Sequence, residues 1–210
     1  MTPRRYLVTQ IFLAIFFIFV AVPVTHGNLD DSVKKYKNNN VSQDDIKKLA
    51  RYDHLIRYFT NFSYFVPRHK VSPNFIRALI LAESGGNARA VSNKNALGLG
   101  QILLTTGKEA ATKLAQSATH FQYVSKRQLE DLSANDLFDP AINILLTCYL
   151  VAKYNYKFDG KLHLVVSAWN AGENTASLSL GQHAPYQETE DLIGKVNAYY
   201  VYLLKHRIFQ

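Results

Sequence analysis

Residues 83–101 read ESGGNARAVSNKNALGLGQ, and this stretch decides how the rest of the chain is interpreted. The pair Gly85-Gly86 follows an apolar run, and glycine in that position commonly ends a helix. Upstream, Ser72-Pro73 supplies an N-cap and a first-turn proline. The sequence therefore predicts a helix over residues 73–84, followed by a loop rich in Asn, Ser and Gly that can turn sharply.

Glu83 violates the apolar pattern of its own helix. Three apolar residues lie three, four and seven positions before it, namely Ile80, Leu79 and Ile76. Its carboxyl therefore shares their face, where burial and the negative end of the helix dipole both raise a pKa. Such a carboxyl suits general acid chemistry near neutral pH. The alternative on helix phase alone is a carboxylate that reaches solvent or pairs with Arg77 or Arg89.

Sequence signals for helix starts recur along the rest of the chain. Ser42 followed by Asp45 resembles a capping box, and Asp139-Pro140 is a typical helix start. No stretch alternates with period two for long enough to make a convincing strand. Further helices are expected over residues 42–64, 140–156, 162–171 and 188–203. The predicted fold class is all-α.

The first 27 residues have the pattern of an export signal. Arg4 and Arg5 precede an apolar run over residues 6–24, and Thr25 and Gly27 offer a cleavage site. We expect residues 1–27 to be a signal peptide and the protein to reach the periplasm or cell envelope. A retained N-terminal anchor is the alternative, because about 19 apolar residues can just span a bilayer. Residues 28–45 are polar and are expected to form a linker.

The chain is basic, with 24 Lys and Arg against 16 acids. Cleavage after residue 27 removes two arginines and no acid, so the remainder stays basic. That balance favours an acidic partner such as nucleic acid, anionic lipid or an anionic wall polymer, without deciding between them. An exported protein makes nucleic acid an unattractive partner, and contact with a membrane is expected only through an uncleaved leader.

Several other kinds of site are not expected. Cys148 is the single cysteine, so an intramolecular disulfide is impossible, and its apolar neighbours predict a buried side chain. The seven histidines lack ligand spacing, so no metal is implied. Gly98-Leu99-Gly100 lacks a third glycine and a preceding strand, which argues against a dinucleotide loop. No cofactor is expected.

Further motifs follow residues 83–101 at fixed intervals. They are Phe138-Asp139-Pro140, Asn143-Ile144, Ser167-Ala168-Trp169-Asn170-Ala171-Gly172 and Pro185-Tyr186-Gln187-Glu188-Thr189. Together they resemble the catalytic domain of the soluble lytic transglycosylase family, a branch of the lysozyme-like fold. The resemblance covers residues 46–210 and implies a lysozyme-like helical domain with a catalytic cleft.

The resemblance also implies roles for particular residues. Glu83 occupies the position of the single catalytic acid/base. Substrate-binding positions are expected at Ser84, Ser92, Gln101, Trp169, Asn170 and Glu188. The implied substrate is peptidoglycan, cleaved between N-acetylmuramic acid and N-acetylglucosamine with formation of a 1,6-anhydro ring. Small members with an export signal often serve a secretion or conjugation apparatus, which makes such an apparatus a candidate partner.

A single carboxyl is also what the sequence around Glu83 offers. Ordinary glycosidases use two carboxylates, yet no acid occurs between Glu83 and Glu109. Glu173, expected to be solvated in a loop, and Glu188 are the candidates for a second carboxylate if the protein is instead a hydrolase. A non-catalytic glycan-binding or scaffold protein on the same fold is a further alternative.

Five positions depart from the family pattern. They are Asn95 in place of Gly, Gly100 in place of Met, Leu104 in place of Pro, Leu150 in place of Tyr, and Trp169 in place of Tyr. Asn95 is a mild change, because Asn tolerates positive φ. Gly100 is expected to remove an apolar side chain from the cleft wall. Trp169 exchanges a phenol for an indole that only donates. The segment 108–135 is also longer than the family leads us to expect.

Overall fold

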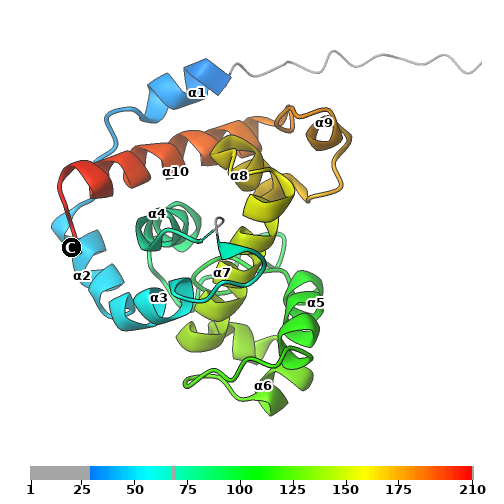
Figure 1. Ribbon diagram of the computed structural model, residues 1–210. Coiled ribbons are helices and arrows are strands. Elements are labelled where there is room, and N and C mark those ends of the chain that lie inside the picture. Colours follow the sequence, from blue (N-terminus) through cyan, green and yellow to red (C-terminus); the bar gives the residue numbers. More distant parts are fainter. Residues whose placement is uncertain (1–28, 68–69, 210) are drawn as a thin grey trace, which may run out of the picture.

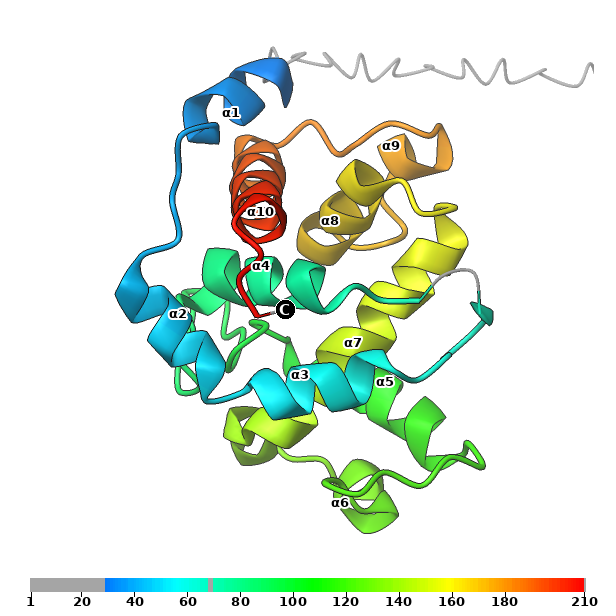
Figure 2. The same cartoon turned by 60° about the vertical axis from the view of Figure 1, so that its left-hand side comes forward.

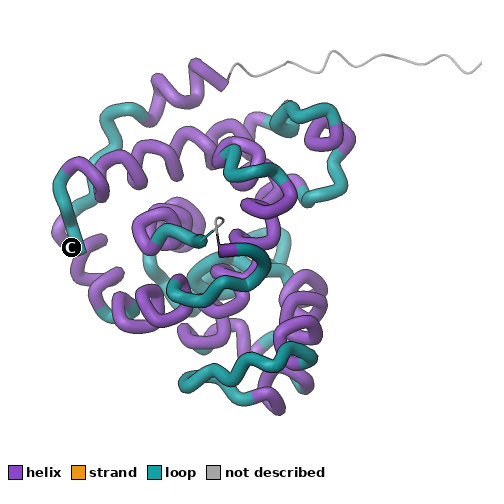
Figure 3. The backbone as a smooth tube through the Cα atoms, in the orientation of Figure 1, coloured by secondary structure: helices purple, strands orange, loops and turns teal. Residues whose placement is uncertain are grey.

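Helices are the regular elements of the computed structural model, which describes residues 29–67 and 70–209 (Figures 1 and 3). The elements are α1 (Leu29–Tyr36), α2 (Gln43–Ala50), α3 (Asp53–Thr60), α4 (Pro73–Ser84), α5 (Leu104–Ala115), α6 (Lys126–Glu130), the 3-10 helix η2 (Asn135–Phe138), α7 (Pro140–Lys157), α8 (Leu162–Ala171), α9 (Ala176–Ser179) and α10 (Gln187–Lys205). Within the described ranges β-pairing is limited to isolated bridges, so the all-α prediction is confirmed.

The expected signal peptide, residues 1–27, lies outside the described residues, and it stays a prediction together with its anchor alternative. Over the ranges that the structure covers, no helix combines the length and the apolar character needed to cross a membrane.

Helix α4 forms the centre of the fold. Figures 1 and 2 show it surrounded by α10 and α8 on one side and by α3 and α7 on the other. It is apolar on nearly all faces and is buried from Phe75 to Leu81, as expected of a helix enclosed by others. It ends at Gly85, as the glycine pair predicts. Enclosure of α4 therefore fixes where Glu83, in its last turn, must lie.

Local signals set most helix boundaries as the sequence predicts. Ser42 and Asp45 form a reciprocal capping box, in which the Asp45 N–H donates to the Ser42 hydroxyl oxygen at 3.1 Å. The Asp139 carboxylate accepts from two N–H groups in the first turn of α7. The stretch expected as one helix over residues 42–64 is two helices, because the chain turns at Tyr52, whose N–H donates to the Leu49 carbonyl at 2.9 Å.

The linker expected over residues 28–45 is wrong for residues 29–36, because they form helix α1. Acids in its first turn and lysines in its last turn suit the helix dipole. The helix packs along α10, where a Cβ on Gly194 would lie 2.6 Å from the Ser32 carbonyl oxygen. Lys35 also pairs with Asp191 of α10 at 3.1 Å. The segment is thus packed against the domain rather than acting as a tether.

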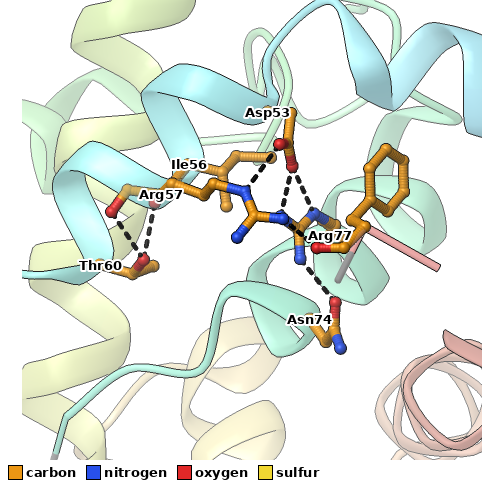
Figure 4. A network of polar contacts seen from close by, with 7 residues as sticks. Asp53, Ile56, Arg57, Thr60, Asn74 and Arg77 are labelled. Atoms are coloured by element: carbon orange, nitrogen blue, oxygen red, sulfur yellow. Dashed lines mark hydrogen bonds and ion pairs between the residues drawn. The ribbon is translucent and has the colours of Figure 1, made fainter. Parts of the chain in front are cut away.

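Arg77 is buried in α4 at the centre of a polar network (Figure 4). Its Nε donates to Asp53 Oδ1 at 3.1 Å, a second guanidinium nitrogen donates to the same oxygen, and Nη1 donates to Asn74 Oδ1 at 2.5 Å. Arg57 Nε donates to Asp53 Oδ2 at 2.8 Å. The Phe209 ring lies over the Arg77 guanidinium, and its carbonyl accepts from Arg57. The network joins α3, α4 and the end of the chain.

The long segment 108–135 extends the aromatic core. Its loop between α5 and α6 places Phe121 and Tyr123 against aromatic residues of α3, with ring centroids of Tyr123 and Tyr58 4.9 Å apart. The Tyr58 hydroxyl also accepts from the Gln122 N–H at 2.8 Å. Cys148 in α7 is buried, as predicted, and burial raises the pKa of its thiol.

Candidate active site

Glu83 lies in an open depression of ≈ 350 Å³ formed by three helices. The lining residues are Ala82 and Glu83 from α4, Asn170 from α8, and Glu188, Asp191, Leu192 and Lys195 from α10. Segments that are more than a hundred residues apart in sequence therefore meet at the end of α4. Three of the predicted site residues, Glu83, Asn170 and Glu188, line this depression together.

The Glu83 carboxyl has the protonation properties that the helix phase predicts. Burial raises its pKa from 4.5 to about 7, against the opposing effect of a hydrogen bond with the Trp169 side chain. The Glu188 carboxylate raises the pKa further, and Lys195 lowers it. The alternative was an ion pair of Glu83 with Arg77 or Arg89. Instead, Arg77 binds Asp53, and Arg89 lies over the Phe138 ring. Glu83 can therefore give up and take back a proton near neutral pH.

Trp169 both contacts Glu83 and packs into the core. Because its indole N–H is a donor only, the hydrogen bond favours the charged carboxylate. The ring also meets Tyr154 edge-on, with centroids 6.5 Å apart. Trp169 therefore belongs both to the hydrophobic core and to the site around Glu83.

Asn170 connects α8 to α10. Its Oδ1 accepts from the Thr189 hydroxyl at 2.6 Å, and its side chain hydrogen-bonds to Glu188. Lys94 Nζ lies 2.6 Å from Glu188 Oε2, and this contact lowers the pKa of Glu188. Thr189 and Lys94 were not among the predicted site residues, although they lie one and two positions from the predicted Glu188 and Ser92.

Ser92 and Gln101 support the loop that follows α4. The Ser92 hydroxyl oxygen accepts from the Ala96 N–H at 3.0 Å, and Gln101 Nε2 donates to the Gly98 carbonyl at 2.8 Å. Neither is among the residues that line the Glu83 depression. The Ser84 hydroxyl donates to the Ile80 carbonyl at 3.1 Å. The substrate contacts predicted for Ser84, Ser92 and Gln101 stay predictions.

The departures within this loop are explained by its backbone. Asn95 has φ of 59°, the left-handed conformation for which Asn is suited. Gly100 was expected to remove an apolar side chain from the cleft wall, but its position is buried and faces α7 instead. A Cβ there would lie 2.4 Å from Thr147 Oγ1. The Gly100 N–H donates to Asn143 Oδ1 at 2.8 Å, and Asn143 Nδ2 donates to the carbonyls of Leu97 in the loop and of Leu137 in η2. Gly100 lets the loop lie close to α7.

We expect Gly100→Ala to destabilise the fold by about 1 to 3 kcal/mol, since the added methyl overlaps Thr147. Thr147→Ala in the same chain removes the overlapping atom and should recover most of the loss. Urea unfolding of the two single variants and the double variant measures this coupling. Equal losses for Gly100→Ala with and without Thr147 would contradict the proposed overlap.

Glu173 lies in the loop after α8, as expected, but it is half-buried rather than fully solvated. It forms ion pairs with Lys153 and, at 3.0 Å, with Lys157; burial opposes ionisation, but these contacts lower its pKa. Glu173 lines a hollow that shares no residue with the Glu83 depression and that includes Leu150, one of the family departures. Of the two candidates for a second carboxylate, Glu188 is the one beside Glu83.

No cluster of three or more His, Cys, Asp or Glu side chains that could hold a metal ion occurs within residues 29–67 and 70–209.

The fold and site define a helical, lysozyme-like domain with a half-buried carboxyl at the end of its central helix. The family model described as "Transglycosylase SLT domain" matches residues 66–190, and the chain belongs to this family.

Two curated relatives carry related names. The chain is 29% identical over 157 residues to a putative soluble lytic murein transglycosylase of Haemophilus influenzae, covering 69% of this chain and 24% of the relative. It is 30% identical over 135 residues to the membrane-bound lytic murein transglycosylase E of Buchnera aphidicola, covering 63% of this chain and 54% of the relative. The matches span about a quarter and about half of these relatives.

A solved structure shows the same fold. The 70-kDa soluble lytic transglycosylase SLT70 of Escherichia coli superposes with a TM-score of 0.59 at 21% identity, covering 74% of this chain and 24% of that chain. The resemblance to the family, and the lysozyme-like fold that it implied, are confirmed.

Trp169→Phe should raise the pKa of Glu83 above its present value of about 7, because it removes the hydrogen bond that favours the carboxylate. Trp169→Tyr keeps a hydrogen-bonding group and should shift the pKa less. An NMR titration of the Glu83 side chain reports the shift. Overlapping profiles for Trp169→Phe and the unchanged protein would show that the indole does not tune Glu83.

Proposed function

We propose that this protein is a peptidoglycan lytic transglycosylase that cleaves the bond between N-acetylmuramic acid and N-acetylglucosamine. The observation that carries the proposal is Glu83, a half-buried carboxyl with a pKa of about 7 that opens onto a depression lined by polar groups of α8 and α10. The names of the curated relatives support the same substrate.

In the proposed reaction, Glu83 acts first as an acid and then as a base. The protonated carboxyl gives its proton to the glycosidic oxygen as the bond from that oxygen to the muramoyl C1 breaks. The acetamide oxygen of the same sugar stabilises the positive C1. The Glu83 carboxylate then takes the proton of the muramoyl 6-hydroxyl, whose oxygen bonds to C1 and closes the 1,6-anhydro ring. A pKa near 7 suits both steps.

The polar groups around Glu83 are proposed to hold the sugars. Asn170 and Glu188 offer hydrogen-bonding atoms at the depression, and Thr189 and Lys94 fix their orientation. Ser84, Ser92, Gln101 and Trp169 are proposed to complete the substrate contacts. The basic charge of the chain suits an anionic wall polymer.

A lysozyme-type hydrolase is the second candidate, favoured by Glu188 in the same depression as Glu83. Its carboxylate would have to activate a water on the opposite face of the sugar or attack C1 itself. The ion pair with Lys94 and the hydrogen bond to Asn170 already engage Glu188, which favours a substrate-positioning role.

Export to the periplasm or cell envelope, and service to a secretion or conjugation apparatus that needs local wall opening, complete the proposal. Deletion of residues 1–27 should leave the protein in the cytoplasm, which cell fractionation measures. Periplasmic recovery of the deleted form would contradict the export signal.

The activity is tested by incubating purified peptidoglycan with the protein starting at Asn28. Release of soluble muropeptides above the level seen with Glu83→Gln supports an enzyme. Binding to the sacculi without release would instead support the glycan-binding or scaffold alternative.

A further inference from the structure

Another hollow, of ≈ 410 Å³, lies where the start of α1 meets α8, α10 and the connection between α8 and α10. Its lining residues are Leu29, His163, Ser177, Gly181, Gln182, His183, Pro185 and Glu190. It shares no lining residue with the Glu83 depression. The proposed catalytic chemistry uses none of these groups.

The hollow contains a fully buried carboxyl. Glu190 is 0% exposed, and its Oε1 lies 3.1 Å from His183 Nε2. Its Oε2 has no hydrogen-bond partner among the described residues, and the buried Ser177 Oγ has none either. Buried polar atoms without partners are costly, and a carboxylate oxygen more so. Two atoms at one hollow therefore lack a donor.

The chemistry of these atoms selects the ligand. A carboxylate oxygen and a hydroxyl call for a compact group that carries positive charge and more than one N–H, which describes an ammonium. A metal ion suits the hollow less, because the described residues contain no group of three potential ligands placed to hold one. We propose that this hollow binds a primary ammonium group through Glu190 and Ser177.

The nearest source is the chain itself. Leu29 lines the hollow, and cleavage after Gly27, as the sequence predicts, makes Asn28 the first residue. Consecutive Cα atoms are 3.8 Å apart, so the new α-ammonium lies within one residue of Leu29. Leader removal would then fasten α1 to α10. A free primary amine is the other source of the same group.

The test is a thermodynamic cycle on the chain starting at Asn28. It is prepared with a free and with an acetylated α-amino group, each with Glu190 and with Glu190→Gln. Acetylation should lower Tm by about 5 °C or more when Glu190 is present and by far less in Glu190→Gln, because only the former loses a buried ion pair. Asp31→Asn is the matched control: this exposed acid lies closer in sequence, and its removal should leave the effect of acetylation unchanged.

A second arm separates the two sources. Methylammonium chloride is titrated into the chain with a free α-amino group. A Tm rise that requires Glu190 assigns the site to free amines, whereas no rise is expected where the α-ammonium already fills the hollow. Should Glu190→Gln not fold, the labelling rate of the α-amine at pH 8 decides. We expect at least about tenfold slower labelling for the chain starting at Asn28 than for one starting at Gly27, whose amine is displaced by one residue. Equal labelling rates, or equal Tm losses without a methylammonium effect, would overturn the proposal.

Discussion

Glu83→Gln is expected to lower peptidoglycan turnover about a thousandfold or more, because the amide can neither give the first proton nor take the second. Gln has nearly the shape of Glu, so the fold should persist. Glu130→Gln, which changes an exposed glutamate of α6, is the matched control and should retain full turnover. Turnover by a folded Glu83→Gln protein at more than a few per cent of the control would remove Glu83 from its proposed role.

The same substitution should change how stability depends on pH. Since burial raises the pKa of Glu83 from 4.5 to about 7, the folded state binds a proton more tightly than the unfolded state. Proton binding by Glu83 therefore stabilises the folded state fully below about pH 4.5, and this stabilisation is lost as pH rises through 7. Glu83→Gln lacks this loss and should be more stable by up to about 3 kcal/mol at pH 8, with little difference at pH 4. Urea unfolding at the two pH values measures it.

Asp53→Asn should destabilise the fold by about 3 kcal/mol, because it leaves the buried Arg77 guanidinium without its counter-charge. Asp53 also holds Arg57, which binds the Phe209 carbonyl, so the end of the chain should loosen. Asp44→Asn is the matched control, because its pair with Lys48 is exposed and should matter little. Urea unfolding of both variants makes the comparison, and equal stabilities would contradict a structural role for the network.

The pH dependence of this network has a definite sign. Burial alone would raise the pKa of Asp53, but hydrogen bonds from Arg57 and Arg77 outweigh it and lower the pKa. The network therefore stabilises the fold fully at pH values above the pKa of Asp in the unfolded chain. This stabilisation is lost as pH falls through the lower pKa that Asp53 has in the folded protein. A chain that carries both Asp53→Ala and Arg77→Met lacks this contribution. Any acid unfolding that remains in it therefore comes from other carboxylates.

Local sequence signals were enough for α4, α7, α8 and α10, and for the face of α4 that carries Glu83. Ser42, Pro73, Gly85 and Asp139 each act on their own turn, so their effects can be read without knowledge of the fold. Helix α1 was missed because its sequence is polar: what stabilises it is the surface of α10, including the close approach at Gly194, which lies far away in sequence.

The site was predictable only in part for the same reason. The resemblance placed Asn170 and Glu188, but the partners Thr189 and Lys94 depend on how α8, α10 and the loop meet. Gly100 was misread because its neighbour is Thr147 of α7, a contact that no local pattern encodes. The buried pair of Glu190 and His183 likewise has no signature in spacing.

The central claim is that a single carboxyl serves as both acid and base. The chemical structure of the new glycan ends tests it most directly. Purified peptidoglycan is digested in water enriched in oxygen-18 with the chain starting at Asn28, and the muropeptides are analysed by mass. We predict 1,6-anhydro-muramic ends that are one water lighter than reducing ends and carry no heavy oxygen, because the 6-hydroxyl of the sugar closes the ring. Reducing ends labelled with oxygen-18 would contradict the account and establish a hydrolase.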